Sequence, residues 1–308
     1  MGQSTRCRGR RPLKGRVVVV TGAARGVGAA LARDLAGRGA HVALLGHGRD
    51  RLERLAAELP TPAQAVEADV TDDDGMAAAA REVREGLGLP SAVVANAGIA
   101  EGGPFVSSDP ALWRRVIDVN LTGSAVTARV FLPDLLRTHG YFLQVASLAS
   151  FGSAPMMSAY CASKAGVEAF AHSLRAELAH RGVGVGIGYL NWTDTDMIRD
   201  GDKYPVLREL RGHMPPPARR IHPVATVAGR LADAVEHRRA AIYVPAWLRA
   251  VQGIRAAMPV VVTAVSRHEL ARLEAAGPLE HTGPLGAGGA ADLAARAPAS
   301  PGPPARGT

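Results

Sequence analysis

Tyr160 and Lys164 are the residues of this chain whose types and spacing point most directly to chemistry. They lie four positions apart in the stretch AYCASKAGVEAF, at 159–170, and residues with that spacing share one face of a helix. An ammonium beside a phenol stabilises the phenolate, so the pair could exchange a proton with a reacting oxygen. The same spacing also occurs in ordinary surface pairs, and the other motifs have to distinguish these two interpretations.

A glycine-rich stretch, TGAARGVG at 21–28, follows the first apolar run and opens a predicted helix. Its glycines permit a tight turn and close approach of the backbone to a phosphate, while the N-terminus of the helix offers free N–H groups. Glycines also serve simple helix–strand packing, but the position after the first strand favours dinucleotide binding. The candidate contacts in this loop are Gly22, Arg25, Gly26, Val27 and Gly28.

The end of the second predicted strand indicates which dinucleotide is bound. An acidic residue there would hydrogen-bond a ribose hydroxyl of NAD, but this chain has Gly46, followed by His47 and Arg49. Arg25 lies inside the glycine turn, and a guanidinium suits a phosphate because of its forked donors. We therefore expect NADP(H) to be favoured over NAD(H). The alternative is that Arg25 and Arg49 are solvated surface residues.

The elements that must position these residues alternate between short apolar runs and longer segments of helical periodicity. Continuous runs such as VVVV at 17–20 indicate strands that are buried on both sides. The alternation predicts an α/β fold of the doubly wound Rossmann type, with a parallel sheet of about seven strands, helices on both faces and a ligand site at the carboxyl ends of the strands. The predicted strands cover 16–22, 41–46, 63–70, 91–98, 141–148, 183–191 and 240–245, and the predicted helices cover 26–40, 49–59, 72–88, part of 111–140, 159–182 and 224–237.

Charge and cysteine content argue against several classes of protein. The net charge is +8, and six basic residues stand in the first sixteen positions, which contain no acid. The rest of the chain is close to neutral, so no nucleic-acid-binding surface is expected over the fold. Two cysteines, Cys7 and Cys161, are too few for a disulfide framework or a metal cluster and fit a reducing, cytoplasmic compartment. The apolar run at 17–20 is too short for a signal peptide or a membrane-spanning helix.

Composition divides the chain into four predicted parts. Residues 1–15 are expected to form a basic, disordered arm, and 16–245 the alternating α/β domain. Residues 246–276 are expected to form a helical extension. Residues 277–308 consist mainly of glycine, alanine and proline, which cannot bury a core, and this composition predicts a disordered tail.

Several motifs in a fixed order make the chain similar to the classical short-chain dehydrogenase/reductase family over about residues 14–245. Beside the glycine stretch and YCASK at 160–164, the matching motifs are Asp69–Val70, NAG at 96–98, Asn120 in the fourth helix and Ser147 at the end of the fifth strand. The resemblance implies that 16–245 is the catalytic domain of an NAD(P)-dependent oxidoreductase acting on a carbonyl/alcohol pair. It also implies a homodimer or homotetramer.

The resemblance implies a role for each residue of the reaction site. Tyr160 is the general acid in carbonyl reduction and the base in alcohol oxidation. Ser147 hydrogen-bonds the reacting oxygen, while Lys164 holds the nicotinamide ribose and lowers the pKa of the phenol. Asn120 supports a water molecule that connects Lys164 to solvent. The physical chemistry agrees, because donors aimed at an oxygen that gains charge during hydride transfer stabilise the transition state.

Further cofactor contacts are implied on the neighbouring strands. By the resemblance, Asp69 and Val70 flank the adenine, Asn96 supports the strand beside the cofactor, and Ala97 and Gly98 contact the cofactor.

One departure from the family pattern follows the sixth strand. The family usually has a Pro-Gly pair there, leading to a threonine that contacts the nicotinamide amide. This chain has Leu190 and Asn191 in place of the pair, while Thr195 remains and Trp192 adds bulk. We expect Thr195 to keep its contact. Trp192 either lines the substrate cavity or packs the turn.

The predicted substrate loop is 196–223. Its apolar residues, with two methionines before the catalytic tyrosine, indicate either an apolar carbonyl or alcohol substrate or ordinary packing. These residues are Met156, Met157, Met197, Ile198, Tyr204 and Met214.

Two alternatives stay open at the level of the whole protein. The segment PAWLRAVQGIRAAMPVVVTAV, at 245–265, could lie on a membrane surface as a basic amphipathic helix, pack on a partner subunit or cover the pocket. A non-catalytic, dinucleotide-binding redox sensor is the alternative to the enzyme. A sensor would need only the cofactor half of the site, whereas this chain also carries the Ser–Tyr–Lys set.

Overall fold

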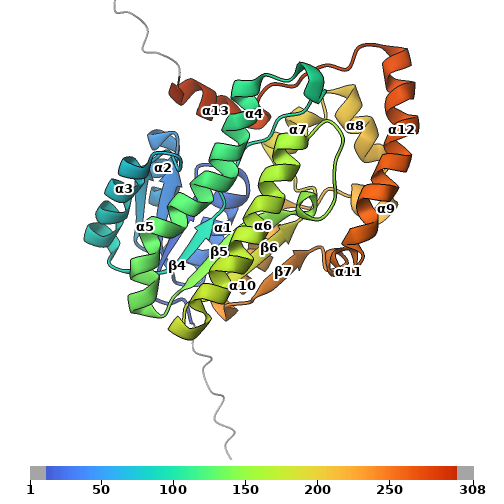
Figure 1. Cartoon of the computed structure of the whole chain (residues 1–308). Helices are drawn as coiled ribbons and strands as arrows, with labels where there is room; N and C mark the ends of the chain where they lie inside the picture. Colours follow the sequence, from blue (N-terminus) through green and yellow to red (C-terminus); the bar gives the residue numbers. More distant parts are fainter. Residues whose placement is uncertain (1–11, 297–308) are drawn as a thin grey trace, which may run out of the picture.

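The computed structural model of the chain describes residues 12–296, where helices cover both faces of one parallel sheet (Figure 1). The strands follow the order β3-β2-β1-β4-β5-β6-β7, which confirms the predicted Rossmann-type fold. The order reverses between β1 and β4, and such a switch point is where a doubly wound sheet binds its ligand. The strands are β1 Val17–Thr21, β2 His41–Gly46, β3 Ala63–Glu67, β4 Pro90–Ala95, β5 Tyr141–Ser147, β6 Gly184–Leu190 and β7 Ala241–Val244.

The valines of β1 show why the sheet needs a helical layer on each side. Side chains alternate between the two faces of a strand. Val17 and Val19 accordingly join one hydrophobic cluster, while Val18 and Val20 join the other, and all four are buried. A continuous apolar run therefore suits a strand in the middle of the sheet.

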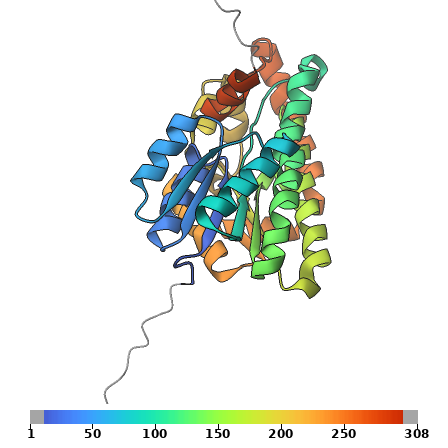
Figure 2. The same cartoon turned by 90° about the vertical axis from the view of Figure 1, so that its left-hand side faces the viewer.

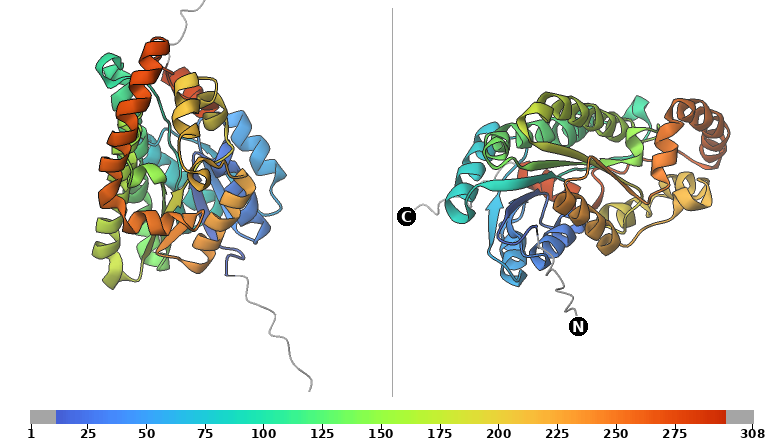
Figure 3. Two further views of the ribbon diagram at one scale, coloured as in Figure 1. Left: turned by 90° about the vertical axis from the view of Figure 1, so that its right-hand side faces the viewer. Right: turned by 90° about the horizontal axis from the view of Figure 1, so that it is seen from below.

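Helices α1, α2 and α10 cover one face of the sheet, and α3, α5 and α6 cover the other (Figure 3, right). Leu31 of α1, Leu52 of α2 and Leu231 of α10 are fully buried in the first layer. The two layers hold the loops at the carboxyl ends of the strands in place. The helix bounds are α1 Gly26–Gly37, α2 Arg49–Glu58, α3 Asp73–Leu87, α5 Gly123–Thr138, α6 Ser158–Leu178 and α10 Val224–His237.

The predicted long helix within 111–140 is interrupted. Helix α4, Pro110–Ile117, begins where the Asp109 carboxylate accepts a hydrogen bond from the backbone N–H of Ala111. A π-helical turn, Asp118–Thr122, then separates α4 from α5. Such turns are frequent at functional sites, and this one carries Asn120.

The irregular segment after β6 contains three short helices, α7 Asp196–Gly201, α8 Pro205–Gly212 and α9 Pro216–Arg219. They lie at the end of the sheet where the strands have their carboxyl ends (Figure 1). Prolines at the first positions of α8 and α9 fit these helix starts, because proline has no N–H to leave unpaired there.

The segment after β7 continues as α11, Leu248–Gly253, and α12, Met258–Ala276. Leu248 is buried, and Arg255 donates a hydrogen bond of 3.0 Å to the buried Glu168 carboxylate of α6. Helix α12 runs along the outside of the molecule and exposes Val260, Val261 and Val265 (Figure 3, left). Within residues 12–296, no helix combines the length and the apolar character needed to cross a membrane.

The structure differs from the predictions at both ends of the chain. In the predicted arm, residues 1–11 lie outside the described part, but Leu13 is buried in the core. The prediction of a disordered tail over 277–308 is wrong for its described part, because Gly286–Arg296 forms helix α13 beside the carboxyl ends of the strands (Figures 1 and 2). The physical reason is that backbone hydrogen bonds, one buried carboxylate and the single buried leucine Leu285 attach this segment. Residues 297–308 lie outside the described part.

Candidate active site

The loops at the carboxyl ends of the strands enclose one cavity that receives most of the residues singled out in the sequence. Arg49 and Asn120 are the two candidates that do not line it. The candidates that line it are Gly22, Arg25, Gly26, Val27, Gly28, His47, Asp69, Val70, Asn96, Ala97, Gly98, Ser147, Tyr160, Lys164 and Thr195.

The glycine loop between β1 and α1 has no room for side chains at two of its positions. A Cβ on Gly28 would lie 2.2 Å from the carbonyl oxygen of Gly22, and a Cβ on Gly22 would lie 2.8 Å from the backbone of Ala97. Gly22 also has a φ of 64°, which favours glycine. The loop thus leaves its backbone and the N-terminus of α1 open to the cavity, as a phosphate-binding turn requires.

The loop after β4 is fixed to β1 through one threonine. The Thr21 hydroxyl accepts hydrogen bonds from the backbone N–H groups of Asn96, at 3.0 Å, and Ala97, at 3.1 Å. In return, the Asn96 carboxamide donates to the Thr21 carbonyl at 2.9 Å. Asn96 therefore joins the two strands that flank the switch point, as the resemblance implies.

Ser147 ends β5 and faces the cavity from the turn Leu148–Ser150. Its hydroxyl accepts a hydrogen bond of 3.2 Å from the N–H of Ala149. The Ser150 hydroxyl donates to the carbonyl of Lys164 at 2.8 Å, which joins this turn to α6. The turn that follows Ser147 and the helix that carries Tyr160 and Lys164 are thus held to one another.

Tyr160 and Lys164 face the same cavity from α6, with the ammonium nitrogen 5.7 Å from the centre of the phenol ring. Lys164 Nζ also donates to the carbonyl of Val145 at 3.3 Å. Burial lowers the pKa of Lys164 to about 8, because the charged form loses its hydration.

The pKa of Tyr160 differs in direction from the expectation. Burial raises it to about 12, and a hydrogen bond with Ser147 opposes this without cancelling it. In the protein without a cofactor, the pKa of Tyr160 is therefore not lowered, although a lowering by the Lys164 ammonium was expected. Loss of solvent around the buried phenolate is the largest cause of this shift.

Asn120 is fully buried beneath the cavity and does not line it. Its carboxamide accepts a hydrogen bond from the N–H of Ile99 at 2.8 Å and donates to the Ile99 carbonyl at 3.0 Å and to the Ser163 hydroxyl at 2.9 Å. This side chain fastens the loop after β4 to α6. Asn120 and Lys164 both lie next to Gly98. A Cβ on Gly98 would lie 3.1 Å from Asn120 Oδ1 and 3.6 Å from Lys164 Nζ.

The departure from the family pattern after β6 leaves the cavity wall intact. Leu190, Asn191 and Thr195 line the cavity. Asn191 is buried, and its carboxamide donates to the carbonyl of Ala218 at 3.0 Å. Trp192 does not line the cavity, and its ring lies 5.6 Å from the guanidinium of Arg211. Of the two interpretations of Trp192, the structure favours packing of the turn.

The part of the cavity lined by α7 receives few of the apolar residues predicted to contact a substrate. Met197 and Ile198 of α7 line it together with Ile99 and Leu285. The remaining candidates do not line it, namely Met156, Met157, Tyr204 and Met214.

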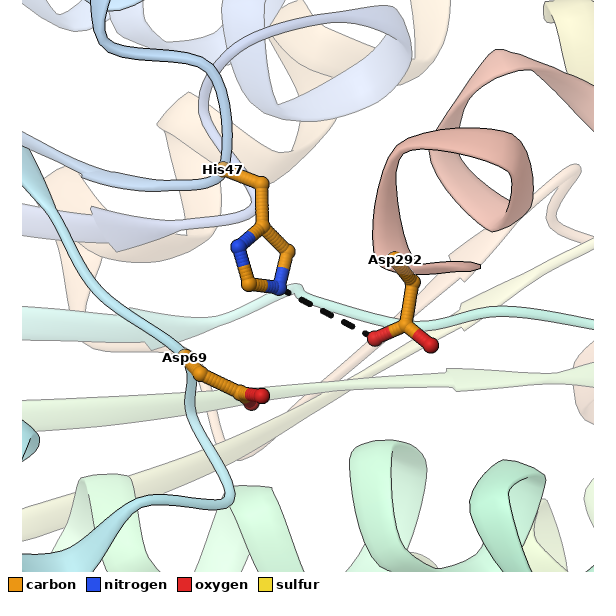
Figure 4. A group of neighbouring side chains, drawn as sticks. All are labelled: His47, Asp69 and Asp292. Atoms are coloured by element: carbon orange, nitrogen blue, oxygen red, sulfur yellow. Dashed lines mark ion pairs between the residues drawn. The ribbon is translucent and has the colours of Figure 1, made fainter. Parts of the chain in front are cut away.

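The adenosine side, at the ends of β2 and β3, contains a cluster that the sequence did not reveal. His47, Asp69 and Asp292 meet there, with His47 Nε2 3.8 Å from Asp292 Oδ1 (Figure 4). The Arg115 guanidinium of α4 lies between the carboxylates, at 2.7 Å from Asp69 and 2.6 Å from Asp292. Hydrogen bonds from the Thr71 backbone N–H, from Arg115 and from the Thr71 hydroxyl hold the pKa of Asp69 below its usual value, against the effect of burial.

Arg51, rather than Arg49, lies with Arg25. A second cavity beside the glycine loop is lined by Arg25, Arg51 and Arg54. Burial and then the charge of Arg51 lower the pKa of Arg25. Arg49 is exposed and pairs with Glu53 at 3.3 Å, outside both cavities. Residues two positions apart on a helix face different directions. The prediction from the sequence considered only positions 46–49 and did not reach position 51.

Comparisons with known proteins agree with this geometry. Residues 16–204 match the family model described as short chain dehydrogenase. Nodulation protein G of Rhizobium sp. (strain N33) is 34% identical over 224 residues, which cover 71% of this chain and 89% of that protein. Cis-4-hydroxycyclohexanecarboxylate dehydrogenase of Sinomonas cyclohexanicum is 37% identical over 187 residues, covering 59% and 75%. The crystal structure of a metagenomic short-chain oxidoreductase in complex with NADP is 34% identical, covers 58% of this chain and 83% of that one, and has a TM-score of 0.56.

The chain therefore belongs to the short-chain dehydrogenase/reductase family, as the sequence motifs predicted. It is an oxidoreductase of the class that acts on alcohol and carbonyl substrates with an NAD(P) dinucleotide.

Proposed function

We propose that this oxidoreductase transfers a hydride between NADP(H) and an apolar carbonyl or alcohol, with Ser147, Tyr160 and Lys164 at the reacting oxygen. The observation that carries the proposal is the convergence of these three side chains and the glycine loop on one cavity at the switch point of the sheet. The dinucleotide would supply the hydride chemistry itself.

The three side chains have distinct tasks in carbonyl reduction. The hydroxyls of Ser147 and Tyr160 donate hydrogen bonds to the carbonyl oxygen as negative charge develops on it. Tyr160 then gives its proton to that oxygen. Its pKa of about 12 keeps the phenol protonated at neutral pH, so it enters reduction as an acid. Lys164, one turn further along α6, stabilises the phenolate that remains when its ammonium is charged.

The glycine loop and the basic residues beside it support the cofactor assignment. The close approach of Gly28 to Gly22 leaves bare backbone where a pyrophosphate would bind. Arg25 and Arg51 are proposed to hold the 2′-phosphate of NADP(H), since no carboxylate follows β2 at Gly46 and both arginines face the cavity beside the loop. The related metagenomic oxidoreductase, by its description, is in complex with NADP.

The apolar residues on the substrate side support an apolar carbonyl or alcohol. Ile99, Met197 and Ile198 line this part of the cavity, and methionine adapts to irregular apolar shapes. One relative is named for the oxidation of a cyclohexane alcohol that carries a carboxylate. A panel of cyclic and straight-chain ketones and aldehydes therefore covers the chemistry that the cavity favours.

Steady-state oxidation of NADPH and NADH with this panel tests the proposal, with Tyr160→Phe as the control. Turnover with NADPH that is lost in the variant is the expected result. Tight binding of the dinucleotide without turnover of any carbonyl in the panel or any corresponding alcohol would favour the redox sensor instead.

The oligomeric state and the cellular location of the protein are two further proposals. We propose a cytoplasmic homodimer or homotetramer, as the family resemblance implies, and sedimentation velocity measures the oligomeric state. Peripheral membrane contact through 245–265 has less support, because Leu248 is buried and Arg255 pairs with Glu168. Exposed Ile254 and the exposed valines of α12 are what remains to support it. Vesicle co-sedimentation of the full chain, with Val260→Ser and Val261→Ser together as the variant, decides that point.

A further inference from the structure

The segment 281–296, named here the C-terminal cap, connects the substrate half of the cavity to its cofactor half. Beside the substrate half, the N–H of Thr282 donates to the carbonyl of Gly102 at 2.8 Å, and the N–H of Leu285 donates to the carbonyl of Ala100 at 2.8 Å. Over the cofactor half, Arg25 of the glycine loop donates to the carbonyl of Ala287. The cap thus lies across the mouth of the whole site, beyond the residues 16–204 that match the family model.

The far end of the cap reaches into the adenosine side. Asp292 of α13 is buried, and its carboxylate accepts hydrogen bonds from Arg115 Nε at 3.0 Å and Arg115 Nη2 at 2.6 Å. One imidazole nitrogen of His47 and one carboxylate oxygen each of Asp69 and Asp292 all lie within 4.8 Å of one another. Figure 4 shows these three side chains. Because His47 follows β2, this is the region where a doubly wound fold binds the adenosine ribose.

The three side chains leave no gap for an adenine ring between them. Packed carbon atoms lie about 3.5–4.0 Å apart, so a ring between two of these side chains requires a gap of about 7 Å or more. The cavity that remains has a volume of about 240 Å³. Sites for drug-sized ligands measure roughly 300–1,000 Å³, and a dinucleotide is larger than such ligands.

A metal ion is an alternative occupant of the same three side chains. A histidine and two carboxylates can bind a cation, but the Arg115 guanidinium already supplies the positive charge between both carboxylates. The cluster therefore needs no ion to balance it, and its position on the adenosine side points to the cofactor.

We propose that the C-terminal cap is an autoinhibitory plug, which occupies the adenosine half of the site and which the dinucleotide must displace. This inference rests on the proposed function. One feature of α13 favours its release: Gly288 lies where a Cβ would meet nothing within 4 Å, and glycine disfavours a helix by about 1 kcal/mol relative to alanine. Leu293 is exposed, so the side chains that attach the cap are Asp292 and the buried Leu285, which directly precedes α13. Segments with few buried apolar contacts open at low cost.

The test compares the full-length chain with Asp292→Ala by titration with NADPH and with NADH. If the cap closes the site for nine-tenths of the time or more, the variant should bind both dinucleotides about tenfold more tightly. Glu280→Gln is the matched control, since Glu280 is an exposed carboxylate of the adjoining segment and should leave both affinities unchanged. Amide hydrogen exchange of the full-length wild-type chain provides the second readout. Exchange in 286–296 should become faster when NADPH is added.

The alternative outcomes separate this inference from the proposed function. Slower exchange in 286–296 with NADPH, together with weaker binding by Asp292→Ala, would show that the cap closes over a bound cofactor, and would overturn the plug. A gain for NADPH alone would overturn it as well, since Asp292 would then act through its charge on the 2′-phosphate. Equal affinities of wild type and variant would overturn the plug while leaving the dinucleotide site in place. Absence of binding by either dinucleotide would overturn the proposed function and, with it, the plug.

Discussion

The Lys164 ammonium lies 5.7 Å from the centre of the Tyr160 ring, one helical turn further along α6, and burial moves the pKa values of the two groups in opposite directions. The phenol becomes a weaker acid, with a pKa of about 12, and the ammonium a stronger one, with a pKa of about 8. Near neutral pH, both groups thus hold their protons, which is the state that carbonyl reduction requires.

The pKa of Lys164 predicts the pH dependence of reduction. Since kcat/KM reports the free enzyme, its value for carbonyl reduction should decrease as pH rises through about 8, where neutral lysine no longer stabilises the developing phenolate. Lys164→Arg should move that decrease to higher pH, because a guanidinium stays charged. A wild-type profile that is flat from pH 7 to about pH 10, measured by initial rates, would contradict the assignment.

The same pKa predicts how the stability of the cofactor-free protein depends on pH. The folded-state pKa of Lys164 is lowered from 10.5 to about 8, so the unfolded chain binds more protons in that interval. The contribution of Lys164 to the free energy of unfolding should therefore increase as pH rises from about 8 to about 10. Urea unfolding at several pH values, with Lys164→Met as the comparison, measures this contribution. If the free energy of unfolding rose less steeply with pH in wild type than in the variant, the prediction would be contradicted.

Arg51 should contribute to the preference for NADP(H). Arg51→Ala removes a guanidinium from the basic cavity beside the glycine loop, and the loss of a charge-assisted hydrogen bond should weaken NADPH binding about tenfold. NADH has no 2′-phosphate, so its affinity should stay within about twofold. Arg49→Ala is the matched control, because Arg49 lies two positions away and pairs with Glu53. Fluorescence titration of both variants gives the four affinities. An equal loss in both variants would refute the selective role of Arg51.

Asn120 should contribute to stability as well as to the site. Asn120→Ala leaves the N–H and the carbonyl of Ile99 without their partner in a fully buried position. The free energy of unfolding should decrease by about 2–6 kcal/mol, since each of the two unsatisfied groups costs about 1–3 kcal/mol. Asn120→Asp keeps the acceptor for the Ile99 N–H and should retain more stability in denaturant unfolding. Equal stability of wild type and Asn120→Ala would show that the loop after β4 is held elsewhere.

Sequence reasoning reached the sheet and the reacting residues because both leave strong local patterns. The four valines of β1 need two helical layers, and the i, i+4 spacing of Tyr160 and Lys164 survives folding into α6 unchanged. The glycine loop was also predictable from the sequence, because any side chain at Gly22 or Gly28 would collide with the neighbouring backbone.

The C-terminal cap could not be predicted by the same reasoning. The glycines and alanines of the cap show no hydrophobic periodicity. The cap is attached through Arg115, which is far away in the sequence, and no sequence pattern pairs Arg115 with Asp292. The direction of the Tyr160 pKa was missed because spacing along a helix reports neighbours and not burial. Arg51 was missed because the sequence at the end of β2 does not show where α2 turns its side chains.

Single-turnover transfer of deuterium from 4-deuterated NADPH to a ketone of the panel tests the central claim most directly. Wild type should place the deuterium on the carbinol carbon. Tyr160→Phe should bind NADPH with unchanged affinity and transfer the label at least about a hundredfold more slowly, since it lacks the general acid. Transfer by Tyr160→Phe at the wild-type rate would contradict the role of Tyr160. Failure of wild type to label the product of any ketone or aldehyde in the panel would contradict the proposed carbonyl reduction.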